Sequence, residues 1–316
     1  MRFLPDRPNG TTVTVGTFDG VHLGHQAVLR EIAERARAAD RHSVLVTFEP
    51  HPLEIVNPQA APPLLTTGPE RREVLAATGL DYVVFLRFDR RLAGFSPERF
   101  VREVLIERCR MRELVIGHDH GFGRGRSGDV ETLRRLGRTD GFAVDVVAPV
   151  EIGGHPVSST HIRRAVAGGD LATAARLLGR PYSVSGAVTH GAGRGRSIGV
   201  PTINLGGLSS RKLLPPDGVY AAWVEWRGGR LGGMLNQGPK PTFEDASRSV
   251  EVHLFGFEGD LYGEWVKVEW VERLRDVQRF ASPEKLINQL QRDRERAQQV
   301  LAQAAPHSDP SRVSHA

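Results

Sequence analysis

The stretch from Thr11 to Phe48 constrains the fold more strongly than any other part of the chain. A strand-like run over Thr11–Gly16 passes through a glycine-bearing turn into a helix-like run over Gln26–Ala39, and a second apolar run follows at Ser43–Phe48. A strand, a helix and a strand in this order form a βαβ unit, whose strands are parallel and whose crossover is right-handed. We therefore expect an open α/β sheet, which binds its ligand beyond the carboxyl ends of the strands.

The rest of the first half continues this alternation and predicts a Rossmann-like domain with a parallel sheet. Three further strands are expected, at Tyr82–Leu86, Glu113–Gly117 and Ala143–Val147. The helices between them are expected near Pro69–Ala77, Pro97–Arg108 and Asp129–Leu136.

The pattern changes near Gly179-Arg180-Pro181, after which short strand candidates follow one another closely. This spacing is typical of a small antiparallel β-barrel. The barrel strands are expected at Tyr182–Thr189, Gly218–Trp226, Leu231–Asn236, Ser249–Phe257 and Glu264–Arg273. A tight hairpin is expected with Gly228-Gly229 at its centre. A C-terminal helix is expected after Ser282, with an apolar side made of Leu286, Ile287, Leu290, Ala297 and Leu301.

The length of 316 residues fits two domains. We expect them at residues 1–180 and 181–305, followed by a disordered tail over 306–316. No apolar run approaches the roughly 20 residues of a membrane span, so no membrane partner is expected. The single cysteine, Cys109, excludes an intramolecular disulfide framework and a cysteine zinc cage, and it favours a cytoplasmic location.

The net charge of +5 suits either nucleic acid or small polyphosphate ligands. The arginines lie in glycine-rich loops and in helices, not in one basic arm with interleaved aromatic residues. Nucleic-acid binding is therefore not expected.

The turn Gly16–His25 is the first candidate site. Free backbone N–H groups and the positive end of the helix dipole favour a phosphate at this junction of strand and helix. His22 and His25 are three residues apart, so both imidazoles lie on one face of the first helical turn. Donors in this position suit the charge that develops when a nucleotide phosphate is attacked. The alternatives are a structural turn with two exposed histidines, or a zinc site, which would need further ligands.

Two later loops could join this site. The segment Gly117–Gly128 offers glycines that allow close approach to a ligand and arginines that can bind phosphate. On its own it would be a flexible surface loop, but its position after a sheet strand favours function. In Ser158–Arg163 a serine before a helix is an ordinary N-cap. The functional alternative is that its hydroxyl and N–H groups hold a triphosphate, which Arg163 neutralises.

In the second domain a glycine- and arginine-rich loop, Gly191–Gly199, leads to Thr202 and Asn204. These two side chains are two residues apart, so in an extended segment they point to the same side. Neutral oxygens together with phosphate oxygens suit Mg²⁺. Glu251 lies opposite the apolar face of its strand, where it is either a solvated carboxylate or a general base that takes a hydroxyl proton. The strand periodicity leaves both alternatives open.

Taken together in their order, these motifs resemble the bifunctional riboflavin kinase/FAD synthetase family of bacteria over roughly Thr11 to Leu301. In the first domain the resemblance rests on the Gly16–His25 motif, Phe48-Glu-Pro-His-Pro52, Gly117-x-Asp-x-x-Phe-Gly-x-x-Arg-x-Gly128 and Ser158-Ser-Thr-x-Ile-Arg163. In the second domain it rests on Gly179-Arg-Pro-Tyr-Ser183, Gly195-Arg-x-x-Gly-x-Pro-Thr-x-Asn204, Gly218-Val-Tyr220, Asn236-x-Gly238, Pro241-Thr-Phe243 and Val250-Glu-x-His253. The chain departs from the usual family pattern at His120, where Phe is common, and at Gln237, where an apolar residue is common.

The resemblance implies an N-terminal FMN adenylyltransferase of the nucleotidyltransferase fold and a C-terminal riboflavin-kinase barrel. ATP, riboflavin, FMN and FAD are the implied partners, Mg²⁺ is the implied cofactor, and a homo-oligomer remains open. The implied catalytic residues are His22, His25, Arg163 and Glu251. The implied nucleotide-binding residues are Gly16, Thr17, Phe18, Asp19, Gly24, Asp119, Ser159, Thr160, Gly193, Gly195 and Arg196. The implied flavin-binding residues are Phe48, His51 and Asn236, and Thr202 and Asn204 are the implied metal ligands.

Three other functions compete with this one. A single-activity FAD synthetase would keep the barrel as a fold only, although Thr202, Asn204 and Glu251 are all present. An adenylyltransferase for another nucleotide would share the histidine motif but would not account for the second domain. A basic RNA-binding or flavin-sensing regulator would need an interaction role for the barrel.

Overall fold

The computed structural model describes residues 8–117, 129–191, 200–239 and 248–304. The expected disordered tail lies outside the described residues. By its internal contacts the chain divides into two compact units. The first contains the described residues up to Ile162 together with Leu177–Gly179, and the second contains Arg163–Arg176 and the described residues from Arg180 onward.

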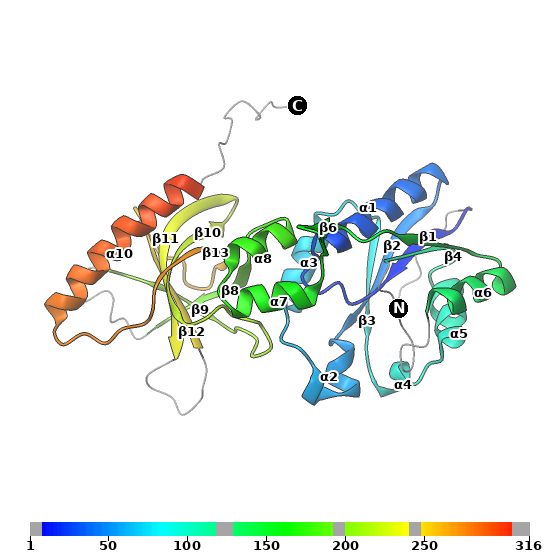
Figure 1. The fold of residues 1–316 in the computed structure, drawn as a ribbon, viewed down its shortest axis with the longest axis horizontal. Helices are drawn as coiled ribbons and strands as arrows, with labels where there is room; N and C mark the ends of the chain where they lie inside the picture. The colour runs from blue at the N-terminus through cyan, green and yellow to red at the C-terminus, as the bar shows by residue number, and fades with distance from the viewer. Residues whose placement is uncertain (1–7, 118–128, 192–199, 240–247, 305–316) are drawn as a thin grey trace. The chain divides into compact units, whose positions relative to one another are not determined.

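The first unit is built on a five-stranded parallel sheet with the order β3-β2-β1-β4-β5 (Figure 1). All five expected strands are confirmed. The order reverses beside β1, which has β2 on one side and β4 on the other, and such a switch point is where open α/β sheets bind ligands. The strands are β1 (Thr11–Val15), β2 (His42–Glu49), β3 (Tyr82–Arg87), β4 (Met111–Gly117) and β5 (Ala143–Val147).

Helices cover both faces of this sheet. On one face α1 (Leu23–Ala38) and α3 (Gly68–Ala76) bury apolar side chains such as Ile32 and Leu75. On the other face α5 (Pro97–Phe100), a π-helical turn η2 (Val101–Ile106) and α6 (Val130–Asp140) enclose a second core. The single helix expected over Pro97–Arg108 is therefore two shorter pieces. The remaining elements are α2 (Pro52–Val56), η1 (Pro58–Ala60), α4 (Arg90–Ala93), β6 (Glu151–Ile152), β7 (His155–Pro156), α7 (Ser159–Ala167) and α8 (Leu171–Leu178).

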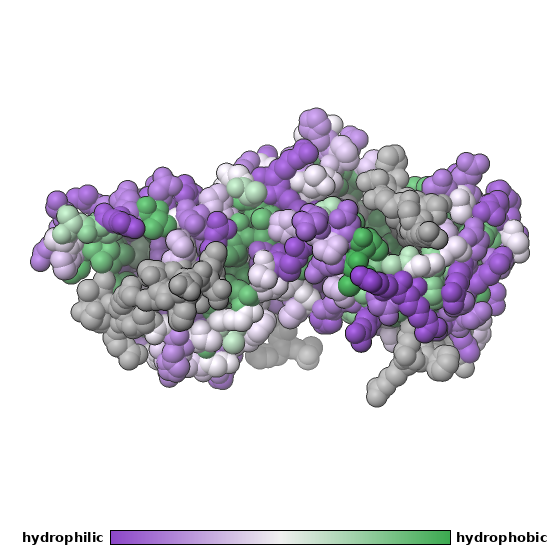
Figure 2. All heavy atoms as spheres, turned by 90° about the horizontal axis from the view of Figure 1, so that it is seen from below, coloured by the Kyte–Doolittle hydropathy of each residue, from purple (hydrophilic) through white to green (hydrophobic). Residues whose placement is uncertain are grey.

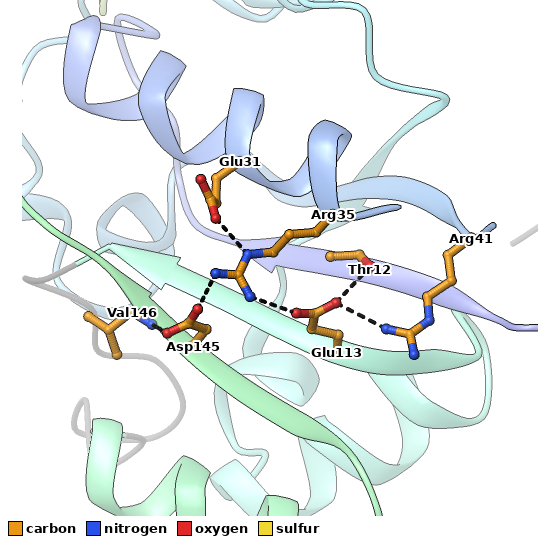
Figure 3. Close-up of polar contacts among 7 residues, drawn as sticks. All are labelled: Thr12, Glu31, Arg35, Arg41, Glu113, Asp145 and Val146. Carbon is orange, nitrogen blue, oxygen red and sulfur yellow. Dashed lines mark hydrogen bonds and ion pairs between the residues drawn. The ribbon is translucent and has the colours of Figure 1, made fainter. Parts of the chain in front are cut away.

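A buried polar network fixes the C-terminal part of α1 on the sheet (Figure 3). The Glu113 carboxylate accepts hydrogen bonds from Thr12 at 3.2 Å and from Arg35 and Arg41 at 3.0 Å each. Arg35 also bonds Glu31 and Asp145, and the hydrogen bond to Glu31 raises the pKa of its guanidinium above the usual range. Buried charges are tolerated when they are paired in this way. Thr12 and Glu113 lie near the starts of their strands, so the network leaves the carboxyl ends free for a site.

The second unit is a closed antiparallel barrel with the strand order β10-β11-β12-β9-β8-β13, which confirms the expected architecture. Most of the side chains that line its interior are apolar: Tyr220, Leu235 and Val252 are direct cross-strand partners with no exposed surface. The short strand β9 was not among the expected strands. The strands are β8 (Ser183–Thr189), β9 (Ile203–Gly206), β10 (Gly218–Trp226), β11 (Gly229–Pro239), β12 (Arg248–Leu254) and β13 (Trp265–Arg275).

The helix α10 (Pro283–Ala304) packs on the outside of the barrel, across β10 and β11 (Figure 1). Ala297, Val300 and Leu301 are buried against strand residues that include Met234. The Arg275 guanidinium holds the Asp293 carboxylate through both of its oxygens. The expected apolar side was wrong at Ile287, which is 36% exposed.

The hairpin between β10 and β11 has Arg227-Gly228 at its centre, one residue earlier than expected. Trp226 pairs with Gly229, and the two residues between them have φ angles of 49° and 78°. Left-handed φ at both central residues is the geometry of a type I′ turn. The register that pairs the buried Val224 with Leu231 leaves only Arg227 and Gly228 for the turn.

None of the described helices is long and apolar enough to cross a membrane. Polar residues occupy most of the described surface on the face drawn in Figure 2. The large apolar side chains that are exposed among the described residues are Val56, Tyr262, Trp265, Val277 and Ile287.

Candidate functional site

The loop between β1 and α1 has a strained backbone that tertiary packing holds in place. Phe18 and Val21 have left-handed φ angles of 48° and 39°, although both carry a side chain and valine is β-branched. Such conformations cost about 1–3 kcal/mol each and concentrate at functional sites. Both side chains are buried in the core that α1 and α3 share, so packing offsets this cost.

His22 and His25 lie together at the start of α1, as their spacing predicts. Their rings stack with centroids 3.6 Å apart, and the His25 ring lies 4.6 Å from that of Phe18. His22 is the N-cap of the helix, and its Nδ1 accepts a hydrogen bond from the backbone N–H of His25 at 3.3 Å. An accepting Nδ1 carries no proton, so the neutral His22 ring carries its proton on Nε2.

Gly24 is required where this pair packs closely. A Cβ at this position would lie 3.2 Å from two atoms of the His22 ring and 3.4 Å from the Val157 carbonyl. The glycine thus lets His22 fold back over the first turn of α1.

The buried side chain of Asp19 stabilises the loop between β1 and α1. The residue is 1% exposed, and its carboxylate accepts hydrogen bonds from the N–H groups of Leu65 and Thr66 and from the Thr66 hydroxyl, at 2.9–3.1 Å. The same hydroxyl accepts a hydrogen bond from the Gly20 N–H at 2.9 Å. Because the carboxylate is committed to these bonds, Asp19 acts on the shape of the loop.

The start of α7 meets the same loop. The Ser159 hydroxyl donates to the backbone carbonyl of Asp19 at 2.9 Å, and Ser158 accepts from the His161 N–H at 3.2 Å as an N-cap does. Thr160 is exposed. Arg163 follows one turn after Ser159 on α7 and is half-buried. The first residues of the motif are thus brought to the β1–α1 loop.

Two of the three predicted flavin-binding residues, Phe48 and His51, lie at or just after the end of β2. The ring of Phe48 is buried in the core beside Phe88 and Phe100, and His51 caps α2 by accepting from the Leu53 N–H at 3.2 Å. Sequence reasoning missed Arg71, whose guanidinium donates to the carbonyls of Thr17 and Phe48. No motif marked Arg71, because an arginine in an amphipathic helix resembles any solvated residue.

In the barrel the strand register brings the predicted polar residues into one row. Asn236 is the direct partner of Glu251, and Glu251 is the direct partner of Asn204, whose other neighbour is Thr189. Direct cross-strand partners have Cβ atoms about 5 Å apart on the same face of a sheet. The neighbours of Glu251, Val250 and Val252, are fully buried, so the row faces away from the barrel interior.

Two contacts hold the segment before β9 beside this row. His253 lies two residues after Glu251, and its Nδ1 is 2.8 Å from the carbonyl of Pro201, so Nδ1 carries the proton and donates it. Gly191 packs directly on the Asn204 amide, since a Cβ there would lie 2.2 Å from the Asn204 Nδ2. His253 therefore fixes the residue that precedes Thr202, and sequence reasoning gave it no role.

Gln237, the departure from the family pattern, points into the barrel and is fully buried. Its Nε2 donates to the carbonyls of Pro215 and Pro216. Asp119, Gly193, Gly195, Arg196 and His120 lie outside the described residues. Within the described part of the chain, no group of three or more His, Cys, Asp or Glu side chains could hold a metal ion by itself.

The chain thus combines a doubly wound parallel sheet, which has a strand–helix turn at its switch point, with a barrel on which a carboxylate lies between two amides. Such a turn is suited to bind a phosphate. Comparison with known proteins specifies the class of protein. Residues 4–161 match the family model described as FAD synthetase, and residues 178–301 match the one described as riboflavin kinase.

Whole-length relatives agree with the two family models. The bifunctional riboflavin kinase/FMN adenylyltransferase of Escherichia coli strain K12 is 39% identical over 298 residues, covering 94% of this chain and 95% of the relative. The protein of the same description from Pseudomonas fluorescens is 38% identical and covers 94% of each chain. The chain belongs to the family of bifunctional riboflavin kinases/FMN adenylyltransferases.

A solved structure shares both domains. A crystal structure described as a macrolide-efflux protein from Streptococcus pneumoniae superposes with a TM-score of 0.81 and 33% identity. The likeness covers 93% of this chain and 95% of that one.

Proposed function

We propose that the two domains act in turn on one flavin. The barrel transfers the terminal phosphate of ATP to riboflavin, which gives FMN and ADP. The parallel-sheet domain then joins FMN to the AMP part of a second ATP, which gives FAD and pyrophosphate. We place the functional boundary at residues 180/181.

In the adenylyltransferase, a phosphate oxygen of FMN attacks the α-phosphorus of ATP and pyrophosphate leaves. The N–H groups of Gly16–Asp19 and of the first turn of α1 are suited to hold the phosphates of ATP. His22, with its proton on Nε2, and the stacked His25 would donate to the oxygens on which charge develops. Ser159, Thr160 and Arg163 would hold the triphosphate, with Asp119 near the nucleotide. Phe48 and His51 would shape the flavin side of the site.

In the kinase, Glu251 would take the proton of the terminal ribityl hydroxyl as its oxygen attacks the γ-phosphorus of ATP. Asn236 would contact the flavin, and the Gly193, Gly195 and Arg196 loop would contact the nucleotide. Asn204 pairs with Glu251 across the strands, and Thr202 and Asn204 would provide neutral oxygens, a donor set that fits Mg²⁺ shared with phosphates. When bound, the ion would neutralise charge on the transferred phosphate. The proposal needs no nucleic acid, and a single cysteine fits the reducing cytoplasm.

The cross-strand row Asn236–Glu251–Asn204 is the observation that carries the kinase half of this proposal. It favours a working kinase over a barrel that keeps the fold alone, because register aligns the proposed base with a proposed metal ligand and a flavin contact.

The test is product chromatography after incubation of the purified protein with ATP and Mg²⁺. Riboflavin should give FMN first and FAD later, and FMN supplied directly should give FAD. Chelation of Mg²⁺ should stop both reactions. Conversion of FMN without conversion of riboflavin would support the single-activity alternative, and the absence of both products would refute the proposal.

A further inference from the structure

Arg71 is a buried cation at the ligand-binding edge of the first unit. It lies in the first turn of α3, which begins with a capping box in which the Thr67 N–H donates to Glu70 at 2.7 Å. The residue is only 4% exposed. No carboxylate among the described residues lies within ion-pair distance of its guanidinium, and its Nε is buried without a hydrogen-bond partner there. Burial lowers the pKa of Arg71, although Asp19 and Glu49 act in the opposite direction.

Stability alone does not account for this arrangement. A buried charge is costly unless a counter-charge and hydrogen bonds compensate it, and an apolar side chain of similar volume is often at least as stable. Departures from such rules tend to occur at functional sites. Arg72, the next residue, shows the ordinary alternative: it is exposed and forms an ion pair with Glu49.

The two hydrogen bonds that Arg71 does make join two loops. Nη1 donates to the Thr17 carbonyl at 2.9 Å, and Nη2 donates to the Phe48 carbonyl at 2.8 Å. Thr17 lies in the loop after β1, and Phe48 lies next to the last residue of β2, the neighbouring strand. The Thr47 hydroxyl also donates to the Thr17 carbonyl, at 3.1 Å. Together with the Thr47 hydroxyl, this planar guanidinium therefore ties the loop after β1 to the end of β2.

We propose that Arg71 is a positioning residue for adenylyl transfer, which fixes the loop that holds ATP relative to the loop that holds FMN. The proposal rests on the function assigned above to the first domain. It also explains why a guanidinium is kept here: its planar fork donates to the Thr17 and Phe48 carbonyls at once, which an apolar side chain cannot do. The other end of α1 is fixed separately by the Glu113 network (Figure 3), so Arg71 controls the loop and not the whole helix.

The test is Arg71→Met, which keeps the aliphatic volume and removes both hydrogen bonds and the charge. A misplacement of about 1 Å can cost about 100-fold in rate, so kcat for FAD formation from FMN should fall about 10- to 100-fold. The KM values for ATP and FMN should change by less than about threefold, because neither substrate is proposed to contact Arg71. FMN formation from riboflavin should be unchanged. Arg71→Lys, which keeps the charge and can reach a carbonyl, should recover part of kcat, and Arg71→Gln should recover less.

Arg72→Met is the matched control, because it removes a neighbouring arginine that also lies over the Phe85 ring. It should leave kcat for FAD formation within about twofold. A merely structural role for Arg71 predicts that the kcat deficit disappears at temperatures where the variant is fully folded, and that result would overturn the proposal. Wild-type kcat in Arg71→Met would overturn it as well. Should Arg71→Met fail to fold, equal kcat values in the Lys and Gln variants would overturn it. Wild-type protein that makes no FAD would instead refute the proposed function.

Discussion

The two units place their candidate site residues in different ways. In the first unit these residues lie mostly in the loop after β1 and in the first turns of the helices α1 and α7. Separate contacts hold them: His22 caps α1, and Asp19 is bonded by Leu65 and Thr66. In the barrel the residues lie on the strands, so the hydrogen-bonded ladder itself places Glu251 between Asn204 and Asn236.

Backbone strain follows the same division. The β1–α1 loop contains Phe18 and Val21 with left-handed φ, whereas in the described part of the barrel Arg227 is the only residue other than glycine with such an angle. Loop sites can adopt unusual shapes only when packing and side-chain bonds enforce them. The comparison therefore predicts that single substitutions away from the chemistry disturb the first site and leave the second intact.

The largest effect is expected at Glu251. Glu251→Gln removes the proposed base and keeps the size of the side chain, so FMN formation should fall about 100-fold or more. FAD formation from FMN and the free energy of unfolding should stay unchanged, because the side chain is half-exposed. Initial rates with riboflavin and with FMN measure both. An equal loss of both activities would contradict the division into two sites.

His25→Ala should have the opposite effect on the two activities. Loss of one donor to a developing charge should lower FAD formation about tenfold or more, while FMN formation is spared. His155→Ala, which removes an exposed histidine of the β6–β7 hairpin, is the matched control and should leave both rates unchanged. Retention of FAD formation in His25→Ala would remove this histidine from the mechanism.

Asp19→Ala tests whether the candidate site of the first unit depends on the hydrogen bonds of a single side chain. It leaves the buried N–H groups of Leu65 and Thr66 without their acceptor, which should lower the free energy of unfolding of the first unit by about 2–4 kcal/mol. FAD formation should fall with it, and FMN formation should persist.

The tryptophans allow the two units to be measured separately. All four lie in β10 and β13, so tryptophan emission follows the unfolding of the barrel, while loss of FAD formation in urea follows the first unit. If Asp19→Ala shifted the urea midpoint measured by tryptophan emission, the effect of Asp19 on stability would extend beyond the first unit.

The sequence predicts the five parallel strands, the barrel and the pairing of His22 with His25, because these depend on local periodicity and spacing. It does not reveal Arg71 or the role of Asp19, because their partners lie far away along the chain: the Asp19 carboxylate bonds residues 46 and 47 positions later. The alternation of apolar and polar residues within β12 did not distinguish a solvated carboxylate at Glu251 from a member of a polar site. That question needed the register of three strands, which no single strand encodes.

The smallest effect is expected at Gln237, in the barrel interior. Gln237→Leu removes the hydrogen bond from Nε2 to the Pro215 carbonyl, and it also removes Oε1, which is buried without a hydrogen-bond partner among the described residues. Pro216 keeps the Tyr220 hydroxyl as a donor. The opposing effects should lower the free energy of unfolding of the barrel by about 1 kcal/mol or less, as measured by tryptophan emission in urea.

The neighbouring residue is the matched control for Gln237→Leu, because adjacent residues on a strand face opposite sides. Asn236→Ala, on the outer row, should leave unfolding unchanged and raise the KM for riboflavin. Gln237→Leu should leave that KM unchanged. If Gln237→Leu raised the KM for riboflavin as well, the barrel interior would be coupled to the outer row. The candidate site of the barrel would then depend on individual side chains as much as the candidate site of the first unit does.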